Sequence, residues 1–289
     1  MRILITGANG QLGLELQRTL DEDEVLATIR DQVDIENRAA VSDAITRFRP
    51  DVVVHAAAYT NVDGCETDPD LAYRVNALGT QNVALACAQV DAAMVYVSSD
   101  YVFDGSKGAP YLEFDDPNPI STYGRSKLAG ERYVQMSLRK YYIVRTAWLY
   151  GVGKNFVRTI LSLADRNGEV LAVTDEVGSP TFARDLAEAI DKLVRHPVYG
   201  IYHLTNDGSC SRHDYVKAIC EAANRKVSVI PITSEEFLAR HPLPARRPPF
   251  SVLHNFCASN ALGIRLRPWQ EALASFISSE NLAIPEHKQ

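Results

Sequence analysis

Short, continuously apolar runs alternate with longer amphipathic stretches through the first half of the chain. The apolar runs predict strands at residues 2–6, 24–29, 51–57, 92–99 and 141–148. Helical spacing of apolar positions predicts helices at residues 11–20, 38–49, 69–90 and 121–136. Strands joined by helical crossovers form a parallel sheet covered on both faces. The pattern therefore predicts an α/β fold with a doubly wound, Rossmann-type parallel sheet.

The second half of the chain is less regular. Its pattern predicts helices at residues 155–168, 182–196, 210–224 and 269–279, with Ser211 as the N-cap of the third. It predicts strands at residues 200–205 and 226–232. The Pro- and Arg-rich segment 241–250 is expected to be irregular, and the tail from residue 283 to be disordered.

These elements suggest two parts. A cofactor-binding Rossmann domain is expected over residues 1–150, with returning segments near 175–205. A smaller C-terminal α/β substrate-binding region is expected over 206–289 with part of 151–175, packed over the binding edge of the sheet.

Composition narrows the class of protein. Hydrophobic residues make up 46% of the chain and charged residues 23%, as in soluble globular proteins. The net charge of −6 gives no reason to expect nucleic-acid binding. We find no apolar run of membrane-spanning length and no signal-peptide pattern. The five cysteines are scattered and show no C-x-x-C spacing, so we expect reduced thiols in a cytoplasmic protein.

Three glycines, Gly7, Gly10 and Gly13, lie where the first strand turns into the first helix. Glycine lets the backbone approach a ligand closely, and the helix N-terminus presents free N–H groups to a pyrophosphate. The spacing is G-x-x-G-x-x-G rather than G-x-G-x-x-G, but its place after the first strand favours a dinucleotide site.

Arg30 bears on the identity of the dinucleotide. It follows the second predicted strand, where an NAD site usually has an acidic residue that accepts from the ribose hydroxyls. An arginine there can meet a 2′-phosphate, so the sequence favours NADPH and leaves NADH open. The alternative is a surface arginine without a ligand.

Ser99, Tyr123 and Lys127 form a candidate catalytic group. Ser99 ends the fourth strand, and Tyr123 and Lys127 are four residues apart on the following helix, on one face. A free tyrosine has a pKa of about 10, and a nearby ammonium lowers it, which makes the phenol a usable acid. Ser99 can orient a carbonyl and donate to the charge that develops on its oxygen. Together they suit reduction of a carbonyl by hydride.

The segments "TGANGQLG", "HAAAYTNVDGCE", "VSSDYVFDG" and "YGRSKLAGE" resemble the extended short-chain dehydrogenase/reductase superfamily. They are most similar to the dTDP-4-dehydrorhamnose reductase family, and "RTAWLYG", "VGSPTFARDLA" and "RRPPFSVL" extend the resemblance over nearly the whole chain.

The resemblance implies roles for individual residues. The catalytic residues would be Ser99, Tyr123 and Lys127. Cofactor contacts would come from Gly7, Gly10, Gln11, Leu12, Gly13, Arg30, Asp34, Ile35, Ala58, Tyr59, Thr60, Tyr123 and Lys127. Substrate contacts would come from Val62, Ser99, Asp100, Tyr101, Trp148 and Arg247.

Three of these assignments carry alternatives. Ser99 stands where the family usually has Thr, so its rotamer is expected to be looser. Trp148 is either a residue of the site or a core aromatic. Arg247, with Arg246, either faces a diphosphate or belongs to a solvated basic loop.

The resemblance also implies that some family members are dimers bridged by Mg²⁺ through glutamates. Glu15 matches one such position, but Arg184 stands at or beside another. A cation is unfavourable next to a metal ligand, so we predict no metal and leave a homodimer open.

The implied activity is reduction of the C4 keto group of dTDP-4-dehydro-L-rhamnose by NADPH or NADH, as a step of nucleotide-sugar and cell-wall polysaccharide biosynthesis. Other nucleotide-sugar reductases and 4-epimerases remain alternatives, as does a non-catalytic regulator similar to the regulatory subunit of methionine adenosyltransferase. A 4,6-dehydratase usually needs an Asp-Glu pair after the Ser or Thr, whereas here Asp100 is followed by Tyr101.

Overall fold

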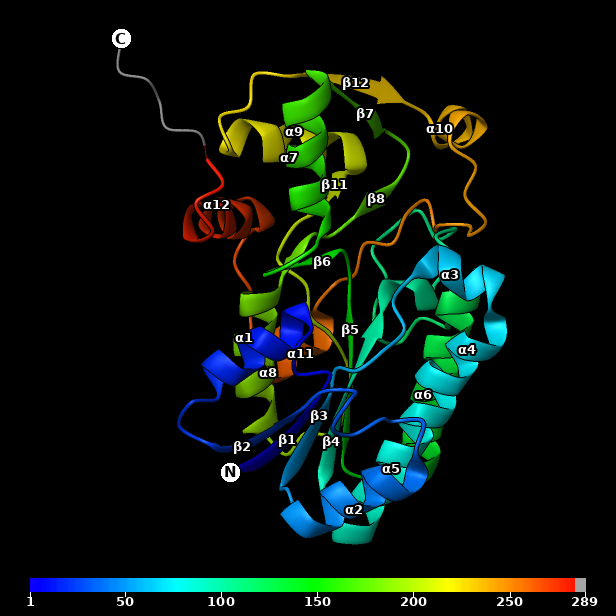
Figure 1. Ribbon diagram of the computed structural model, residues 1–289, viewed down its shortest axis with the longest axis vertical. Coiled ribbons are helices and arrows are strands. Elements are labelled where there is room, and N and C mark those ends of the chain that lie inside the picture. The colour runs from blue at the N-terminus through cyan, green and yellow to red at the C-terminus, as the bar shows by residue number, and fades with distance from the viewer. Residues whose placement is uncertain (284–289) are drawn as a thin grey trace.

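The computed structural model describes residues 1–283, and its centre is a six-stranded sheet in the order β10-β5-β4-β3-β1-β2 (Figure 1). All neighbouring strands of this sheet are parallel, which confirms the predicted fold class. The strands are β1 (Arg2–Thr6), β2 (Glu24–Thr28), β3 (Val52–His55), β4 (Ala93–Ser99), β5 (Tyr141–Thr146) and β10 (Gly200–His203). The chain leaves β1 for β2 on one side and then returns to β3 on the other, so a crevice opens at the carboxyl ends of β1 and β3.

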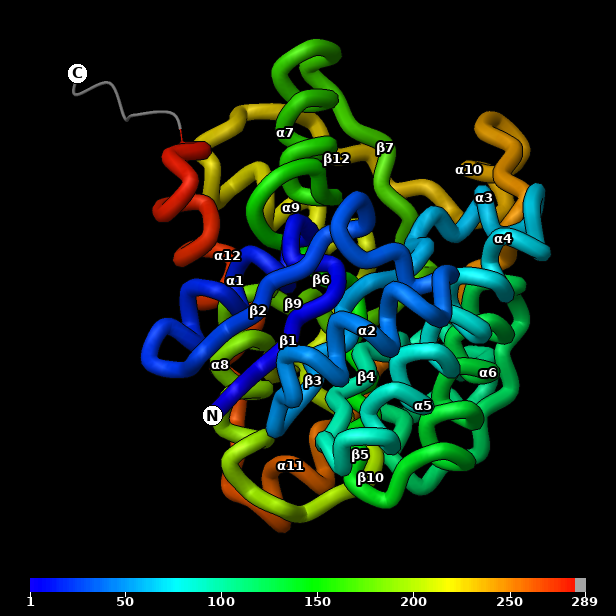
Figure 2. Tube along the Cα trace, turned by 60° about the horizontal axis from the view of Figure 1, so that its bottom comes forward, coloured from blue at the N-terminus to red at the C-terminus, as the bar shows by residue number. Residues whose placement is uncertain are grey.

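Helices cover both faces of the sheet (Figure 2). One face carries α1 (Gln11–Thr19), α8 (Ala183–Val194) and α11 (Phe256–Ala261), whose apolar side chains join those of the strands in one core cluster. The other face carries α2 (Arg38–Phe48), α5 (Thr80–Val90) and α6 (Thr122–Ser137), which bury a second cluster. Burial on both faces explains why the strands are continuously apolar.

A smaller group of elements lies beyond the carboxyl edge of the sheet (Figure 1). Its members are α7 (Phe156–Asn167), β7 (Glu169–Val173), α9 (Arg212–Ala222), β12 (Ser228–Ile232), α10 (Ser234–Arg240) and α12 (Trp269–Ser279). Three pairs of strands connect its elements. β12 pairs with β7, β6 (Leu149–Tyr150) with β9 (Thr181–Phe182), and β8 (Val177–Gly178) with β11 (Cys210–Ser211). Aromatic rings in tilted and edge-to-face contact, including those of Tyr150, Tyr215 and Phe276, fill its core.

The predicted helix over residues 69–90 is wrong in one respect. It divides into α4 (Pro69–Tyr73), a π-helical turn η1 (Arg74–Gly79) and α5. Asn76, within the π turn, is 1% exposed, and its side chain exchanges hydrogen bonds with the backbone of Tyr59 at 2.8 and 3.0 Å. The wider turn thus places the buried amide of Asn76 against the backbone of Tyr59, a contact that the hydrophobic pattern of the sequence does not indicate.

Several smaller elements escaped the sequence pattern. They are α3 (Val62–Thr67), β7, α10, α11 and a 3₁₀ turn η2 (Asp100–Val102). The expected N-cap is confirmed, because Ser211 accepts a hydrogen bond from the backbone of Asp214 at 3.0 Å. Segment 241–250 forms no regular element. Of the tail predicted to be disordered, residues 284–289 lie outside the described part. Within residues 1–283 no helix combines the length and apolarity that a membrane crossing requires.

Candidate active site

A cavity of about 860 Å³ opens along the carboxyl ends of β1, β3, β4 and β5. Its size lies in the upper range of ligand sites in proteins. Every predicted site residue except Arg247 lines it. These are Gly7, Gly10, Gln11, Leu12, Gly13, Arg30, Asp34, Ile35, Ala58, Tyr59, Thr60, Val62, Ser99, Asp100, Tyr101, Tyr123, Lys127 and Trp148.

The glycine turn fits a close-approaching dinucleotide. Gly7 adopts a φ of 71°, and a Cβ at Gly13 would lie 2.3 Å from the carbonyl oxygen of Gly7. Gly10 caps α1 without any side-chain hydrogen bond, so no side chain of the cap occupies the first N–H groups of the helix. Backbone donors at a helix start provide a cradle for a pyrophosphate.

Arg30 lines the same cavity. Its side chain is 71% exposed, with Nε 3.7 Å from Asp34 and one terminal nitrogen 3.2 Å from Glu36. Arg74 contacts the same Glu36 carboxylate at 3.2 Å. Exposed ion pairs of this kind contribute little, so a phosphate can replace either carboxylate as the partner of Arg30.

The catalytic candidates come from β4 and α6. Ser121 caps α6 by accepting from the backbone of Gly124 at 3.1 Å, which fixes where the helix begins. Lys127 is only 2% exposed, and its Nζ lies 4.2 Å from the centre of the Tyr96 ring. Burial lowers the pKa of Lys127 to about 7, against the opposing charge of Glu131. Lys127 therefore exchanges protons near neutral pH.

Burial also changes the acidity expected for Tyr123. Its pKa is raised above the ordinary value, first by burial and then by the carboxyl of Asp100, while a hydrogen bond with Ser99 lowers it. The lowering expected from Lys127 is not seen, because burial dominates at Tyr123 and Lys127 is itself desolvated.

Asp100 is hydrogen-bonded both to the end of β4 and to a residue from the C-terminal part of the chain. It is 2% exposed and follows β4 in the turn η2. The hydroxyl of Ser99 donates to its Oδ1 at 2.8 Å, and the hydroxyl of Ser251 donates to its Oδ2 at 2.6 Å. Burial raises the pKa of Asp100 to about 6, although both hydrogen bonds and the charge of Arg212 act to lower it.

Trp148 and Arg212 also line the cavity. Trp148 has a φ of 45°, and its ring lies so close to Gly178 that a Cβ there would be 2.4 Å away. The guanidinium of Arg212 lies 3.4 Å from the centre of the Trp148 ring and 3.5 Å from Glu176. The sequence reading missed Arg212, whose single signal was its place just after the N-cap Ser211.

Arg247 lies outside this cavity lining. Its guanidinium donates to Asp63 at 2.7 Å and to the carbonyl of Ala245 at 3.1 Å. These contacts hold the irregular segment 241–250 against α3.

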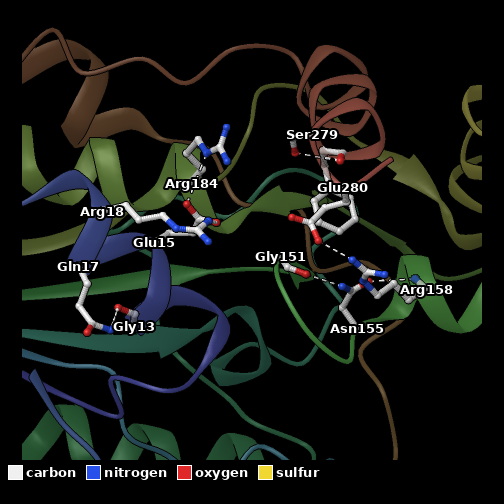
Figure 3. A network of polar contacts seen from close by, with 11 residues as sticks. Gly13, Glu15, Gln17, Arg18, Gly151, Asn155, Arg158, Arg184, Ser279 and Glu280 are labelled. Atoms are coloured by element: carbon white, nitrogen blue, oxygen red, sulfur yellow. Dashed lines mark hydrogen bonds and ion pairs between the residues drawn. The ribbon is translucent and has the colours of Figure 1, made fainter. Parts of the chain in front are cut away.

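The side chains of Glu15, from α1, and Arg184, from α8, point toward each other (Figure 3). Glu15 is 1% exposed, and its carboxylate lies 3.4 Å from Nε of Arg184 and 3.0 Å from Arg18. The cation expected beside Glu15 is therefore in contact with it. Residues 1–283 contain no group of three His, Cys, Asp or Glu side chains placed to bind a metal ion.

A family model, a curated relative and solved structures all identify the same family for this chain. The family model described as the RmlD substrate binding domain matches residues 1–282. The chain is 40% identical to the spore coat polysaccharide biosynthesis protein SpsK of Bacillus subtilis, over 98% of this chain and 99% of that protein.

Two solved structures are also similar. The dTDP-4-dehydrorhamnose reductase of Clostridium acetobutylicum superposes with a TM-score of 0.93 at 44% identity, covering 97% of this chain and 100% of that one. The dTDP-4-dehydrorhamnose reductase of Bacillus anthracis in complex with NADP gives a TM-score of 0.92 at 43% identity, covering 96% and 99%.

Proposed function

The chain belongs to the RmlD substrate binding domain family, and from this premise we propose that it is an NADPH-dependent dTDP-4-dehydrorhamnose reductase. It would reduce the C4 keto group of dTDP-4-dehydro-L-rhamnose to give dTDP-L-rhamnose. The observation that carries the proposal is that Ser99, Tyr123 and Lys127 line the same cavity as the glycine turn. NADH is the alternative hydride donor, because the contacts of Arg30 are exposed and would therefore select weakly for the 2′-phosphate of NADPH.

The residues of the cavity suit NADPH. The backbone of the turn at Gly7, Gly10 and Gly13 would hold the pyrophosphate, and Arg30 would meet the 2′-phosphate. Lys127 would hold the ribose next to the nicotinamide. The bound cofactor supplies the hydride.

Tyr123 would give its phenolic proton to the C4 oxygen as negative charge develops there. Its raised pKa keeps the phenol protonated until that moment. Ser99 would steady the same oxygen by a hydrogen bond. As an ammonium, Lys127 would stabilise the negative charge left on the Tyr123 phenolate, and with a pKa of about 7 it can return a proton to that oxygen.

The sugar nucleotide would lie between Val62, Asp100, Tyr101 and Trp148. Arg212 adds a cation to this side of the cavity, stacked on Trp148. A delocalised guanidinium suits the diphosphate of a nucleotide sugar. We therefore assign Arg212, rather than Arg247, as the arginine that faces the diphosphate.

The other enzymes of the fold fit less well. A 4,6-dehydratase usually has a second carboxylate after Asp100, but Tyr101 stands there. A 4-epimerase recycles tightly held NAD⁺, for which Arg30 is poorly suited. A purely regulatory protein has no need of Ser99, Tyr123 and Lys127 together in one cavity.

The test is oxidation of NADPH, followed at 340 nm, with dTDP-4-dehydro-L-rhamnose as substrate. Tyr123→Phe should abolish turnover and leave NADPH binding largely intact. Tyr133→Phe, on the same helix but outside the cavity lining, is the matched control and should behave as the wild type. Bound NADPH without turnover by the wild type would refute the reductase assignment, and an active Tyr123→Phe variant would remove Tyr123 from the mechanism.

Three broader expectations belong to this proposal. The Rossmann part is taken as residues 1–150 with segments near 175–205, and the substrate-binding part as 206–289 with part of 151–175. A cytoplasmic location and a homodimer are further expectations, which fractionation and light scattering can test.

A further inference from the structure

Two hydroxyl groups point their protons at one buried carboxyl group. Ser99 comes from the end of β4, whereas Ser251 comes from the irregular segment before α11 and is 151 residues from Asp100 in sequence. Ser251 is 2% exposed and Ser99 is 6% exposed, so water competes little with either contact. Asp100 therefore joins the catalytic strand to the C-terminal part of the chain.

The number of protons in this group limits what Ser99 can do. A serine hydroxyl has one proton and two lone pairs. The backbone N–H of Tyr101 already donates to Ser99 Oγ at 3.2 Å. When Asp100 is ionised it can only accept, so Ser99 gives its proton to Asp100 and has none for the sugar's carbonyl oxygen.

A protonated Asp100 reverses this direction. With its proton on Oδ1, Asp100 donates to Ser99 and still accepts from Ser251 through Oδ2. The Ser99 proton is then free to turn toward the cavity and donate to the C4 oxygen. The two states differ by one proton and require no movement of the backbone.

The surroundings favour the protonated state more than usual. Burial dominates and raises the pKa of Asp100 to about 6. Arg212 from α9 opposes burial, while Tyr101 and Tyr123 face the same carboxyl. Arg247 and Glu176 act on Tyr101 with opposite signs. A bound nucleotide sugar would exclude water and add negative phosphates, and both raise the pKa of a carboxyl group.

We propose that Asp100 is a positioning residue for Ser99: held by Ser251, it turns the Ser99 hydroxyl into a donor toward the substrate when it carries a proton. This inference rests on the proposed reductase function, because it assigns Ser99 a donor role at the C4 oxygen. It gives Ser251 a function through Asp100, without contact with substrate.

The test is the pH profile of kcat between pH 5 and 9 for the wild type and Asp100→Asn. In the wild type, kcat should fall by up to about tenfold per pH unit above the pKa of Asp100 in the complex, towards a level roughly 10- to 100-fold lower. The amide of Asn can donate permanently to Ser99 and accept from Ser251. Asp100→Asn should therefore lose this falling limb and keep only the decline that follows deprotonation of Lys127, whose pKa is about 7. The same limb in Asp100→Asn would overturn the proposal.

Ser251→Ala tests the second contact. Without this donor the ionised form of Asp100 is less stable, so the falling limb should move to higher pH, and Ser251→Thr should return it to the wild-type position. Ser234→Ala is the matched control, because Ser234 donates to Asp175 at 2.8 Å at the exposed surface. Its profile should match that of the wild type. A limb that stays in place in Ser251→Ala would contradict the role of Ser251.

A measurement without turnover separates this inference from the reductase assignment. Carbon-13 NMR of the aspartate carboxyls, with Asp100→Asn for assignment, follows the titration directly. Asp100 should titrate above the usual aspartate range, and Ser251→Ala should shift it upward. A normal, unshifted titration would refute the positioning role, whereas absent turnover with the expected titration would refute only the reductase assignment.

Discussion

Replacing Glu131 by glutamine tests whether the ion pair beneath the active site is a structural requirement. Glu131 and Arg145 are each 2% exposed at the side chain, and they share two hydrogen bonds of 2.8 and 3.0 Å. Ser98 donates to the same carboxylate at 2.6 Å. Glu131→Gln keeps the shape but leaves the Arg145 charge buried without a counterion. Breaking a buried pair in this way costs about 3–5 kcal/mol of unfolding free energy.

The assay is urea unfolding followed by circular dichroism, with the slope against urea compared between variants. Glu24→Gln is the control, because Glu24 pairs with Arg2 at 3.1 Å but both side chains are exposed. It should cost less than about 1 kcal/mol. The double variant Glu131→Met with Arg145→Met should regain most of the lost stability, since no charge remains to be desolvated. A cost for Glu131→Gln no larger than that for Glu24→Gln would refute the reasoning.

Three further outcomes are expected. Gly13→Ala would place a Cβ 2.3 Å from the carbonyl oxygen of Gly7, so it should lose about 1–3 kcal/mol or more and bind NADPH weakly; Gly10→Ala, whose nearest atom is 3.2 Å away, should melt near the wild type. Burial lowers the pKa of His203 to about 3, so its contribution to stability is present above pH 6.5 and is lost as pH falls toward 3. Urea unfolding at several pH values should show that the free energy of unfolding depends less on pH in His203→Gln than in the wild type. An unchanged pH dependence would contradict this. Arg30→Ala should weaken NADPH binding more than NADH binding in a fluorescence titration, and an equal loss would exclude contact with the 2′-phosphate.

The sheet could be predicted because its strands carry their signal locally. Val52, Val53 and Val54 are all buried between helices on both faces, so each strand reads as one apolar run. The glycine turn is partly local: Gly7 and Ala8 crowd Gly10 and Gly13, whereas Gly7 itself is crowded by Ala56 and Ala57 after β3. The strand β7 and the π turn at Asn76 depend on distant partners, β12 and the Tyr59 backbone, and no local pattern shows them.

The site was predictable as far as its residues follow strand ends or share a helix face. Tyr123 and Lys127 satisfy both the spacing and the position, and both line the cavity. Arg212 was missed because its contact with Trp148 joins two segments 64 positions apart in the numbering. The protonation state of Lys127 could not be predicted from the pattern either, because its pKa is determined mainly by burial rather than by a neighbouring charge.

The hydroxyl at position 99 shows how such distant contacts compensate for a local difference. The resemblance implies a Thr at this place in the family; a Thr has a β-methyl that restricts the rotamer, whereas Ser99 lacks this restriction. Here the Tyr101 N–H donates to Ser99 Oγ, and Ser99 donates to Asp100, whose other oxygen is held by Ser251. Hydrogen bonds thus orient the oxygen that a methyl group would otherwise fix. Under the positioning role proposed for Asp100, the bond between Ser99 and Asp100 reverses when Asp100 takes up a proton, so the restraint on the Ser99 hydroxyl would respond to pH.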